Sequence, residues 1–222
     1  MKARTVEILK SFASISNQIL FRVGTEVRIA SAQNHKFGIA TLDDEDAFPT
    51  EFAIYDLTEF LSVYGLFEAP VIEYREHECV ISDGDSRKMV HYKYANKAII
   101  NAPSVKPISL GDTRVTFNMS KKVFENATKA AAIMRLNEMR VNENGVTLLN
   151  VERGSDDASG NSYDVDVGDF TVVDLSEKPN LYIAFGDLKM IPDDYVVTFT
   201  TKGVVFDSVQ GDLKYVLSYI TH

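Results

Sequence analysis

The chain has 222 residues, of which 45% are hydrophobic and 25% are charged, and its net charge is −9. This composition is typical of a soluble globular protein and shows no signature of disorder. The single cysteine, Cys79, excludes an intramolecular disulfide framework and a multi-cysteine metal site. No apolar run approaches the roughly 18–20 residues that span a bilayer, so we expect no membrane partner. A charge within the first apolar stretch argues against a signal peptide.

Short strands with turns that carry Gly or Asn make up most of the predicted structure. Three segments have helical periodicity instead. In chain order, the sequence predicts a helix at Ala3–Ser16, strands at Ile19–Val23, Glu26–Ala32 and Phe37–Leu42, an apolar strand at Phe52–Tyr55, a helix at Asp56–Phe67, strands at Val71–Glu76, Cys79–Ser82, Lys88–Tyr94 and Arg114–Asn118, a helix at Ser120–Leu136, and strands at Glu138–Asn142, Val146–Val151, Tyr163–Val167, Leu181–Phe185, Tyr195–Thr200, Val204–Ser208 and Leu213–Ile220.

The helix predicted at Ser120–Leu136 has the clearest signals. Ser120 fits the N-cap position, and Met119 and Phe124 have the spacing of a hydrophobic staple. Lys121 and Lys122 then occupy the first turn, where the helix dipole is positive and each exposed cation costs about 0.3–1 kcal/mol. Residues that destabilise their own helix without any local benefit often have a functional role instead.

The order of elements repeats, which predicts two related β-rich domains. In each half a helix is followed by strands and then by an apolar strand that runs into Asp-Leu, at Asp56-Leu57 and at Asp187-Leu188. The segment between the halves contains Pro103 and Pro107 and has no clear period, as expected of an extended connector. We therefore expect an α+β fold with domains at 1–97 and 112–222, each with a helix pair and a sheet, joined by a connector at 98–111.

Positive charge is concentrated on two of the predicted helices. Residues 2–10 carry a net charge of +2 and residues 121–135 carry +3, which leaves −14 for the rest of the chain. Solvated surface helices would also carry such charges. The matched positions in two repeats, however, favour helices that contact the phosphates of duplex DNA without reading sequence. The candidate DNA-facing residues are Lys2, Arg4, Lys10, Lys121, Lys122, Lys129 and Arg135.

Several motifs resemble those of the sliding clamps of T4-type bacteriophages. They are Ile8-Leu9-Lys10-Ser11-Phe12-Ala13-Ser14-Ile15-Ser16, the run from Phe52 to Leu61, Val167-Gly168-Asp169-Phe170, and the run from Leu188 to Tyr195. The resemblance extends over essentially the whole chain. The predicted helix at Ser120–Leu136 departs from it, because it is rich in alanine and its cations are placed differently.

The resemblance implies the DNA-clamp fold, with helices on one face of each domain and six similar domains in a ring of three subunits. It implies no enzymatic activity and no cofactor. It also implies duplex DNA, the replicative polymerase and an ATP-driven clamp loader as partners, and late-transcription factors as further users of the same surface. The cytoplasm of an infected bacterial host is the implied location.

The resemblance also implies a subunit interface, because in ring clamps the last strand of the first domain pairs with an edge strand of the next subunit. The candidates are the basic residues Arg87, Lys88, His91 and Lys93, opposite Asp164 and Asp166 in the acidic segment Glu152–Asp169. Equally, both edges could be charged only to prevent aggregation. A pocket for partner peptides by the connector is implied as well, although these residues could simply cover the sheet. Its candidates are Ile99, Ile100, Pro103, Val105, Pro107, Ile108, Tyr219 and Ile220.

Two other functions compete with a clamp. A phage structural or assembly protein would keep the strands but would have no reason to place cations on matched helices. A carbohydrate-binding or hydrolytic β-protein would be expected to expose Trp, and the chain has none. His77 and Cys79 would need a third group to orient them as a Cys–His nucleophile, and a partly buried structural cysteine is the better interpretation.

Overall fold

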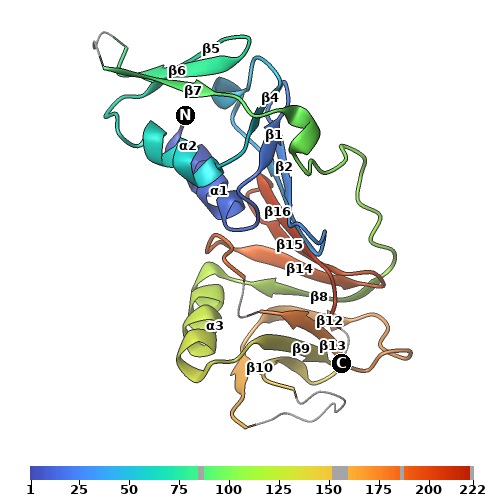
Figure 1. The fold of residues 1–222 in the computed structure, drawn as a ribbon. Coiled ribbons are helices and arrows are strands. Elements are labelled where there is room, and N and C mark those ends of the chain that lie inside the picture. The colour runs from blue at the N-terminus through green and yellow to red at the C-terminus, as the bar shows by residue number, and fades with distance from the viewer. Residues whose placement is uncertain (85–87, 152–159, 186–187, 221–222) are drawn as a thin grey trace. The chain divides into compact units, whose positions relative to one another are not determined.

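The computed structural model describes residues 1–84, 88–151, 160–185 and 188–220. The chain divides into two compact units, Met1–Lys106 and Pro107–His222 (Figure 1). The division falls inside the segment at 98–111 that the sequence suggests as a connector, and the domain limits given above stay a prediction. None of the helices in the described residues is long and apolar enough to cross a membrane.

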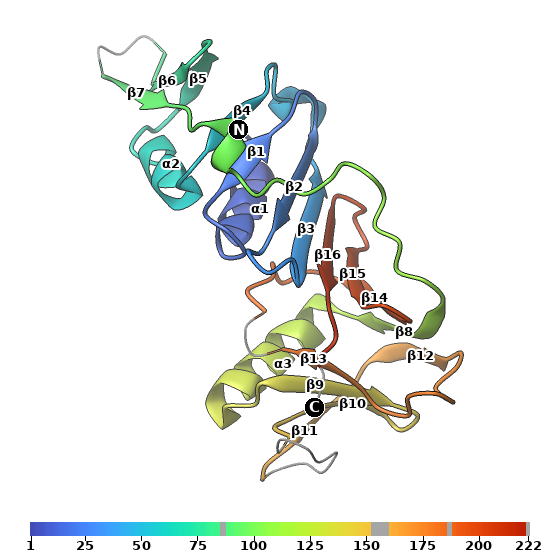
Figure 2. The same ribbon diagram turned by 45° about the vertical axis from the view of Figure 1, so that its right-hand side comes forward.

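The first unit contains two α-helices and seven short strands in its described residues. Its elements are α1 (Ala3–Ala13), β1 (Ile19–Phe21), β2 (Glu26–Ala30), β3 (Lys36–Thr41), the 3-10 turn η1 (Asp44–Asp46), β4 (Phe52–Ile54), α2 (Leu57–Tyr64), β5 (Val71–Tyr74), β6 (Glu78–Ser82), β7 (Met89–Lys93) and the 3-10 turn η2 (Lys97–Ile99). Strand pairs β1–β4 and β2–β3 and the three-stranded sheet β5-β6-β7 are all antiparallel (Figure 2).

The core of the first unit fixes which face of α1 meets solvent. Ile8, Leu9 and Phe12 of this helix are completely or almost completely buried. The ring of Phe12 lies so close to Gly38 on β3 that a Cβ atom there would stand 2.5 Å from Phe12 Cε1. Glycine is therefore required at this position for the helix and strand to approach each other. With its apolar face against the strands, α1 turns its polar face outward.

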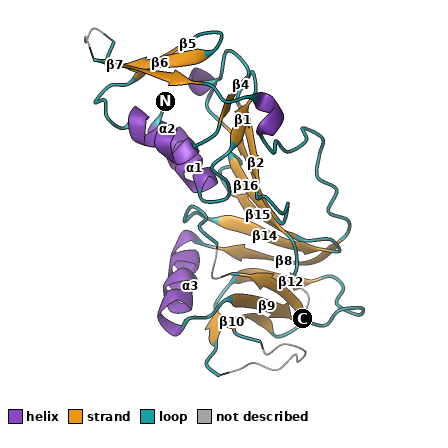
Figure 3. Cartoon of the chain, viewed as in Figure 1, coloured by secondary structure: helices purple, strands orange, loops and turns teal. Residues whose placement is uncertain are grey.

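The second unit has one α-helix in its described residues, and its strands form two antiparallel sheets. Its elements are β8 (Thr113–Met119), α3 (Lys121–Met134), β9 (Glu138–Asn142), β10 (Gly145–Leu149), β11 (Tyr163–Val165), β12 (Gly168–Val172), β13 (Leu181–Ala184), β14 (Tyr195–Thr200), β15 (Val204–Ser208) and β16 (Leu213–Leu217). Strands β11-β10-β9-β13 form one sheet, and β12-β8-β14-β15-β16 are hydrogen-bonded in that order (Figure 3).

The two units differ after the apolar strand that runs into Asp-Leu, which is β4 in the first unit and β13 in the second. In the first unit β4 leads directly into α2, whose N-cap Asp56 accepts a hydrogen bond of 2.9 Å from the Glu59 amide. In the second unit the described residues that follow β13 form no helix, so the expected helix pair is found only in the first unit. Pro192 has no amide hydrogen to offer a helix there. The Tyr215 hydroxyl instead accepts a hydrogen bond from the Ile191 amide at 3.3 Å.

Candidate DNA-facing helices, subunit edges and docking surface

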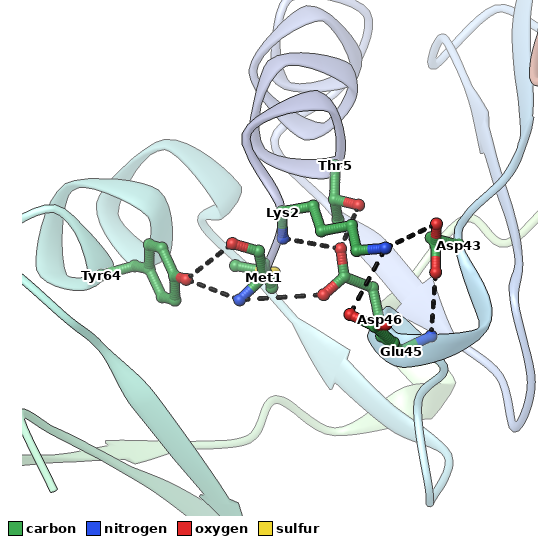
Figure 4. Close-up of polar contacts among 7 residues, drawn as sticks. All are labelled: Met1, Lys2, Thr5, Asp43, Glu45, Asp46 and Tyr64. Atoms are coloured by element: carbon green, nitrogen blue, oxygen red, sulfur yellow. Dashed lines mark hydrogen bonds and ion pairs between the residues drawn. The ribbon is translucent and has the colours of Figure 1, made fainter.

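The start of α1 is held by an aspartate from another part of the chain (Figure 4). Lys2, the N-cap residue, has no side-chain capping bond of its own. Its amide donates to Asp46 Oδ2 at 2.7 Å, and the buried Thr5 hydroxyl donates to the same oxygen. The amino group of Met1 lies 3.8 Å from Asp46 Oδ1 and donates to the Tyr64 hydroxyl at 2.7 Å. Asp46 thus supplies the acceptor that the first turn of α1 lacks.

Two of the three candidate cations at this helix are paired with carboxylates. The Lys2 ammonium lies 2.7 Å from Asp43 and 3.3 Å from Glu45. The hydrogen bond to Asp43 raises the pKa of Lys2, and the same bond lowers the pKa of Asp43. Arg4 makes an ion pair of 3.1 Å with Glu7, one helical turn along. Both cations are therefore partly neutralised within the chain before any anion approaches.

The start of α3 combines a local cap with a remote one. Ser120 Oγ accepts from the Val123 amide at 3.3 Å, as the sequence predicts. Asp194, the residue directly before β14, accepts a hydrogen bond from the Lys121 amide at 2.7 Å. A carboxylate at a helix N-terminus is stabilising and opposes the unfavourable placement of Lys121 and Lys122 in the first turn.

The cations of α3 differ from those at the start of α1 in having no counter-ion within the chain. All four are exposed, and none makes an ion pair among the described residues; they are Lys121, Lys122, Lys129 and the C-cap residue Arg135, which we count with α3. Lys10, at the far end of α1, is likewise exposed and without an ion pair in the described part of the chain. Five of the seven candidate DNA-facing cations are therefore available to an external anion.

Strand β7 lies at one end of its sheet, with β6 as its neighbour in that sheet. Its residues alternate, so that Met89, His91 and Lys93 are exposed and Val90 and Tyr92 are half-buried. His91 Nδ1 lies 2.9 Å from a carboxylate oxygen of Glu78 on β6. Hydrogen bonding to His91 is the main reason that the pKa of Glu78 is lowered.

Strand β11 lies at the end of the sheet β11-β10-β9-β13. Asp164 is exposed on it and accepts a hydrogen bond of 3.0 Å from the Thr147 hydroxyl of β10. Asp166 follows the strand and is also exposed, and Lys88, just before β7, is exposed too. Arg87 lies outside the described residues. The described candidates for the subunit interface therefore lie on or next to two terminal strands of opposite charge.

The first part of the connector is tied to the first unit by two arginines. Arg22 donates to the Pro103 carbonyl at 3.0 Å. Arg28, on β2, donates from one nitrogen to the carbonyls of Ser104 and Lys106, at 2.8 and 2.9 Å. These bonds need no particular side chain in the connector, since they use only its backbone oxygens.

The candidate docking residues divide by exposure. Ile99 and Val105 are 57% and 56% exposed, whereas Ile100 is only 8% exposed and belongs to the core of the first unit. Tyr219 is half-buried in the second unit, where its hydroxyl donates to the Thr200 carbonyl and burial raises its pKa to about 12. Of the others, Pro107 is exposed, and Pro103, Ile108 and Ile220 are half-buried.

The combination of His77 and Cys79 does not form a nucleophile. Cys79 is completely buried in β6, and burial raises the pKa of its thiol to about 11. His77 is exposed and lies 3.7 Å from Glu76. Within the described residues no group of three or more His, Cys, Asp or Glu side chains could hold a metal ion. Cys79 is therefore a structural residue of the core, as the sequence suggested.

The chain is similar over most of its length to a known phage protein. It is 30% identical over 207 residues to the sliding clamp of Vibrio phage KVP40, and the match covers 90% of each chain. This chain belongs to the sliding clamp family. The sliding clamp of Escherichia phage RB69 is 25% identical over 196 residues, covering 87% of this clamp and 83% of that one. No protein-family model matches the chain.

Solved structures support the fold of this clamp. PCNA from Thermococcus kodakaraensis matches with a TM-score of 0.65 at 15% identity, covering 99% of this clamp and 98% of that chain. The beta chain of DNA polymerase III from Streptococcus pneumoniae matches with a TM-score of 0.63 at 12% identity, covering 98% of this clamp and 63% of that chain. The predicted α+β clamp fold is confirmed, and the assembly-protein and carbohydrate-binding alternatives find no support.

Some residues that shape these surfaces were not found from the sequence. Asp46 and Asp194 are separated from the helix starts that they cap by 44 and 73 positions. Arg28 is separated from the carbonyls that it binds by 76 and 78 positions. Nothing in the local pattern of an Asp in a turn, or of an Arg in a strand, indicates such a partner. The nearest signal is the absence of an acidic residue from the first turns of α1 and α3.

Proposed function

We propose that this clamp is one subunit of a homotrimeric ring that encircles duplex DNA and tethers the replicative polymerase to it. One observation carries the proposal. In a chain of net charge −9, α3 presents four exposed cations without a counter-ion among the described residues. Such a face is suited to the phosphates of a duplex, which attract Lys and Arg independently of base sequence.

The contact with DNA is uneven between the two units. Among the residues that the structure describes, Lys10 is the one α1 candidate without an ion pair, whereas all four cations of α3 are available. Lys2 and Arg4 therefore contribute less, because an external phosphate would have to compete with the carboxylates already beside them. In a ring of three subunits, three strongly basic helices would alternate with three weakly basic ones. Few direct contacts suit a protein that is held on DNA by enclosure and has to slide.

Ring closure is assigned to β7 and β11. Each strand is terminal in its own sheet and can accept a further strand on its open side. The exposed cations on or beside β7 and the exposed carboxylates on and beside β11 are complementary. Pairing between different edges of neighbouring copies is head-to-tail, and such a contact closes into a ring when the rotation permits.

Partner docking is assigned to the surface around the connector. The C-terminal region of FEN-1 is bound to a PCNA from A. fulgidus, and a DNA ligase peptide is bound to a beta clamp from Helicobacter pylori. We infer that this clamp also binds a peptide tail, that of the replicative polymerase, at the exposed Ile99 and Val105. The same surface would serve late-transcription factors, and an ATP-driven loader would open the ring.

The clamp itself would do no chemistry. It is assigned no catalytic residue, metal or cofactor, and its role is mechanical, in the cytoplasm of an infected bacterial host. The buried Cys79 agrees with this assignment, because a thiol with a pKa of about 11 is neutral at physiological pH and is not poised as a nucleophile.

Two measurements test the proposal. Native mass spectrometry should give three subunits, and a strict monomer at all concentrations would refute the ring. The clamp should also stimulate processive synthesis by its polymerase on primed circular DNA with loader and ATP. Replacing Lys122 and Lys129 of α3 by Gln should weaken that stimulation. The matched control replaces Lys178 and Lys202, two exposed lysines outside α3, by Gln. Equal losses in the two variants would mean that only net charge matters.

A further inference from the structure

We propose that Arg28 is a positioning residue that holds the connector in one fixed shape for docking partner peptides. This inference rests on the docking role proposed above and adds the residue that maintains the surface. It is drawn from an unusual set of bonds. One strand arginine contacts two backbone carbonyls of a segment with little secondary structure of its own.

A carboxylate on the same strand orients the guanidinium of Arg28. Glu26 Oε1 and Oε2 accept from Arg28 Nε and Nη2 at 2.7 and 3.1 Å, the two-pronged geometry that fixes the plane of the group. This leaves Nη1 to point at the connector, where it donates to Ser104 and Lys106. The side chain of Arg28 is only 11% exposed, so water competes weakly for these donors.

The spacing of the two carbonyls determines the shape of the connector. One nitrogen that lies 2.8 and 2.9 Å from both oxygens requires them to be closer together than the ~6.6 Å between alternate residues of an extended strand, and Val105 and Lys106 do lie in a bend. By holding the oxygens of Ser104 and Lys106 together, Arg28 fixes this bend and places Val105 between the two anchored carbonyls. The Val105 side chain is 56% exposed. Arg22 fixes the preceding carbonyl, that of Pro103, in the same way.

Fixing this segment in advance matters because a flexible segment loses conformational freedom when it orders around a ligand. A segment that is already fixed avoids that loss, and its affinity for a peptide is higher as a result. Without Arg28 the two carbonyls would turn to water, and the connector would sample other shapes. The apolar side chains of the docking surface would be unchanged, and only their arrangement would be lost.

The first unit offers a matched control arginine. Arg75 pairs with Glu73, also two residues earlier, through the same atoms at 2.9 and 3.1 Å. Its third contact is to Glu78 at 3.4 Å and not to the connector, and its side chain is 43% exposed. Changing Arg75 to Gln therefore removes the same charge and the same kind of ion pair without touching the docking surface.

The first experiment measures the connector in the free clamp. A nitroxide attached to Val105→Cys reports its mobility, and labelling is selective because Cys79 is buried. Arg28→Gln should increase the mobility of the label, Arg28→Lys should increase it less, and Arg75→Gln should leave it unchanged. Thermal unfolding identifies any variant that fails to fold. If Arg28→Gln fails, Glu26→Gln is used in its place, because it removes only the carboxylate that orients the guanidinium.

The second experiment measures binding in unlabelled clamps. The probe is a synthetic peptide with the C-terminal residues of the replicative polymerase encoded by the same genome. Arg28→Gln should bind it about tenfold more weakly, roughly the effect of losing one hydrogen bond to a charged group, and Arg75→Gln should bind it like the wild type. A mobile connector with unchanged affinity, or an immobile one, overturns the role of Arg28. A peptide that fails to bind the wild-type clamp overturns the docking function itself.

Discussion

The remote cap of α1 gives the sharpest prediction for stability. Asp46→Ala removes the acceptor of both the Lys2 amide and the Thr5 hydroxyl. Losing a cap costs about 1 kcal/mol. Thr5 is only 2% exposed, so its hydroxyl is left largely without water as a substitute, at about 1–3 kcal/mol. We therefore expect the free energy of unfolding to fall by about 2–4 kcal/mol.

Urea denaturation followed by circular dichroism, at one fixed subunit concentration because assembly also stabilises, would measure the change. Asp46→Asn should cost less than Asp46→Ala, since an amide oxygen can still accept. Asp44→Ala is the control: it removes an exposed carboxylate from the same turn, and the side chain of Asp44 makes no hydrogen bond or ion pair among the described residues. Its effect should stay within about 0.5 kcal/mol.

A double-mutant cycle isolates the buried bond. In a Thr5→Val background no hydroxyl remains to lose its partner, so Asp46→Ala should cost about 1–2 kcal/mol less than it does in the wild type. If Asp46→Ala is no more destabilising than Asp44→Ala, or if the cycle shows no coupling, then Asp46 does not hold the start of α1 and the reasoning fails.

Three further predictions concern other parts of the chain. Asp194→Ala should lower the free energy of unfolding by about 1 kcal/mol, because the Lys121 amide loses its acceptor; equal stability of the two proteins in urea would contradict this. Charge reversal at Lys93, to Glu, should weaken the trimer at low salt in analytical ultracentrifugation, and Asp164→Lys in the same protein should restore it; an absence of rescue would argue against this pairing. Burial raises the pKa of the Cys79 thiol to about 11 in the folded protein, against a value near 9 in the unfolded chain. The neutral thiol should therefore contribute its full share to the free energy of unfolding below pH 9, and this contribution should fall as pH rises from about 9 to about 11. A Cys79→Ser variant that shows the same fall over that range would exclude the thiol as its cause.

Local patterns were enough to predict the elements whose signals lie within a few residues. The helix at α3 begins one residue after the predicted cap, Ser120, and Phe124 of the predicted staple is buried in the structure. The helix predicted at Asp56–Phe67 is α2, with Asp56 as its N-cap. In each case a short side chain, a helical period and an apolar face agree with one another, so tertiary contacts had nothing to override.

Other elements depend on contacts that the sequence does not display. Strand β12 was not predicted: four of its five residues are exposed, its pairing with β8 contains a register shift, and Asp169 has a φ of 47°. A strand without a buried face has no alternation to detect. A second helix was also expected in the second unit, and the described residues after β13 do not form one; the Ile191 amide instead bonds the hydroxyl of Tyr215, which is 24 positions away.

The residue types of the candidate surfaces could be predicted from the sequence, but the ion pairs that those residues make could not. Counting charges identified both basic helices, yet it could not show that Lys2 is held by two carboxylates while Lys129 has no ion pair in the described chain. Those carboxylates, Asp43 and Glu45, come from η1 and its N-cap residue, about 40 residues away in the sequence. Availability of a cation is a property of the folded neighbourhood, and net charge over a segment does not measure it.

The α-helices of the described residues show how charge that caps a helix is kept separate from charge that faces an external anion. Helix α2, which is not assigned to DNA, uses its own acids, with Asp56 as N-cap and Glu59 in the first turn. Helices α1 and α3 have no acid in their first turns, and each takes a carboxylate from a distant segment instead. The remote carboxylate satisfies a backbone amide at the helix start. It therefore stabilises the helix without adding an acidic side chain to the first turn. This arrangement is what a helix needs if its surface has to remain attractive to phosphates, and α2 has no such need.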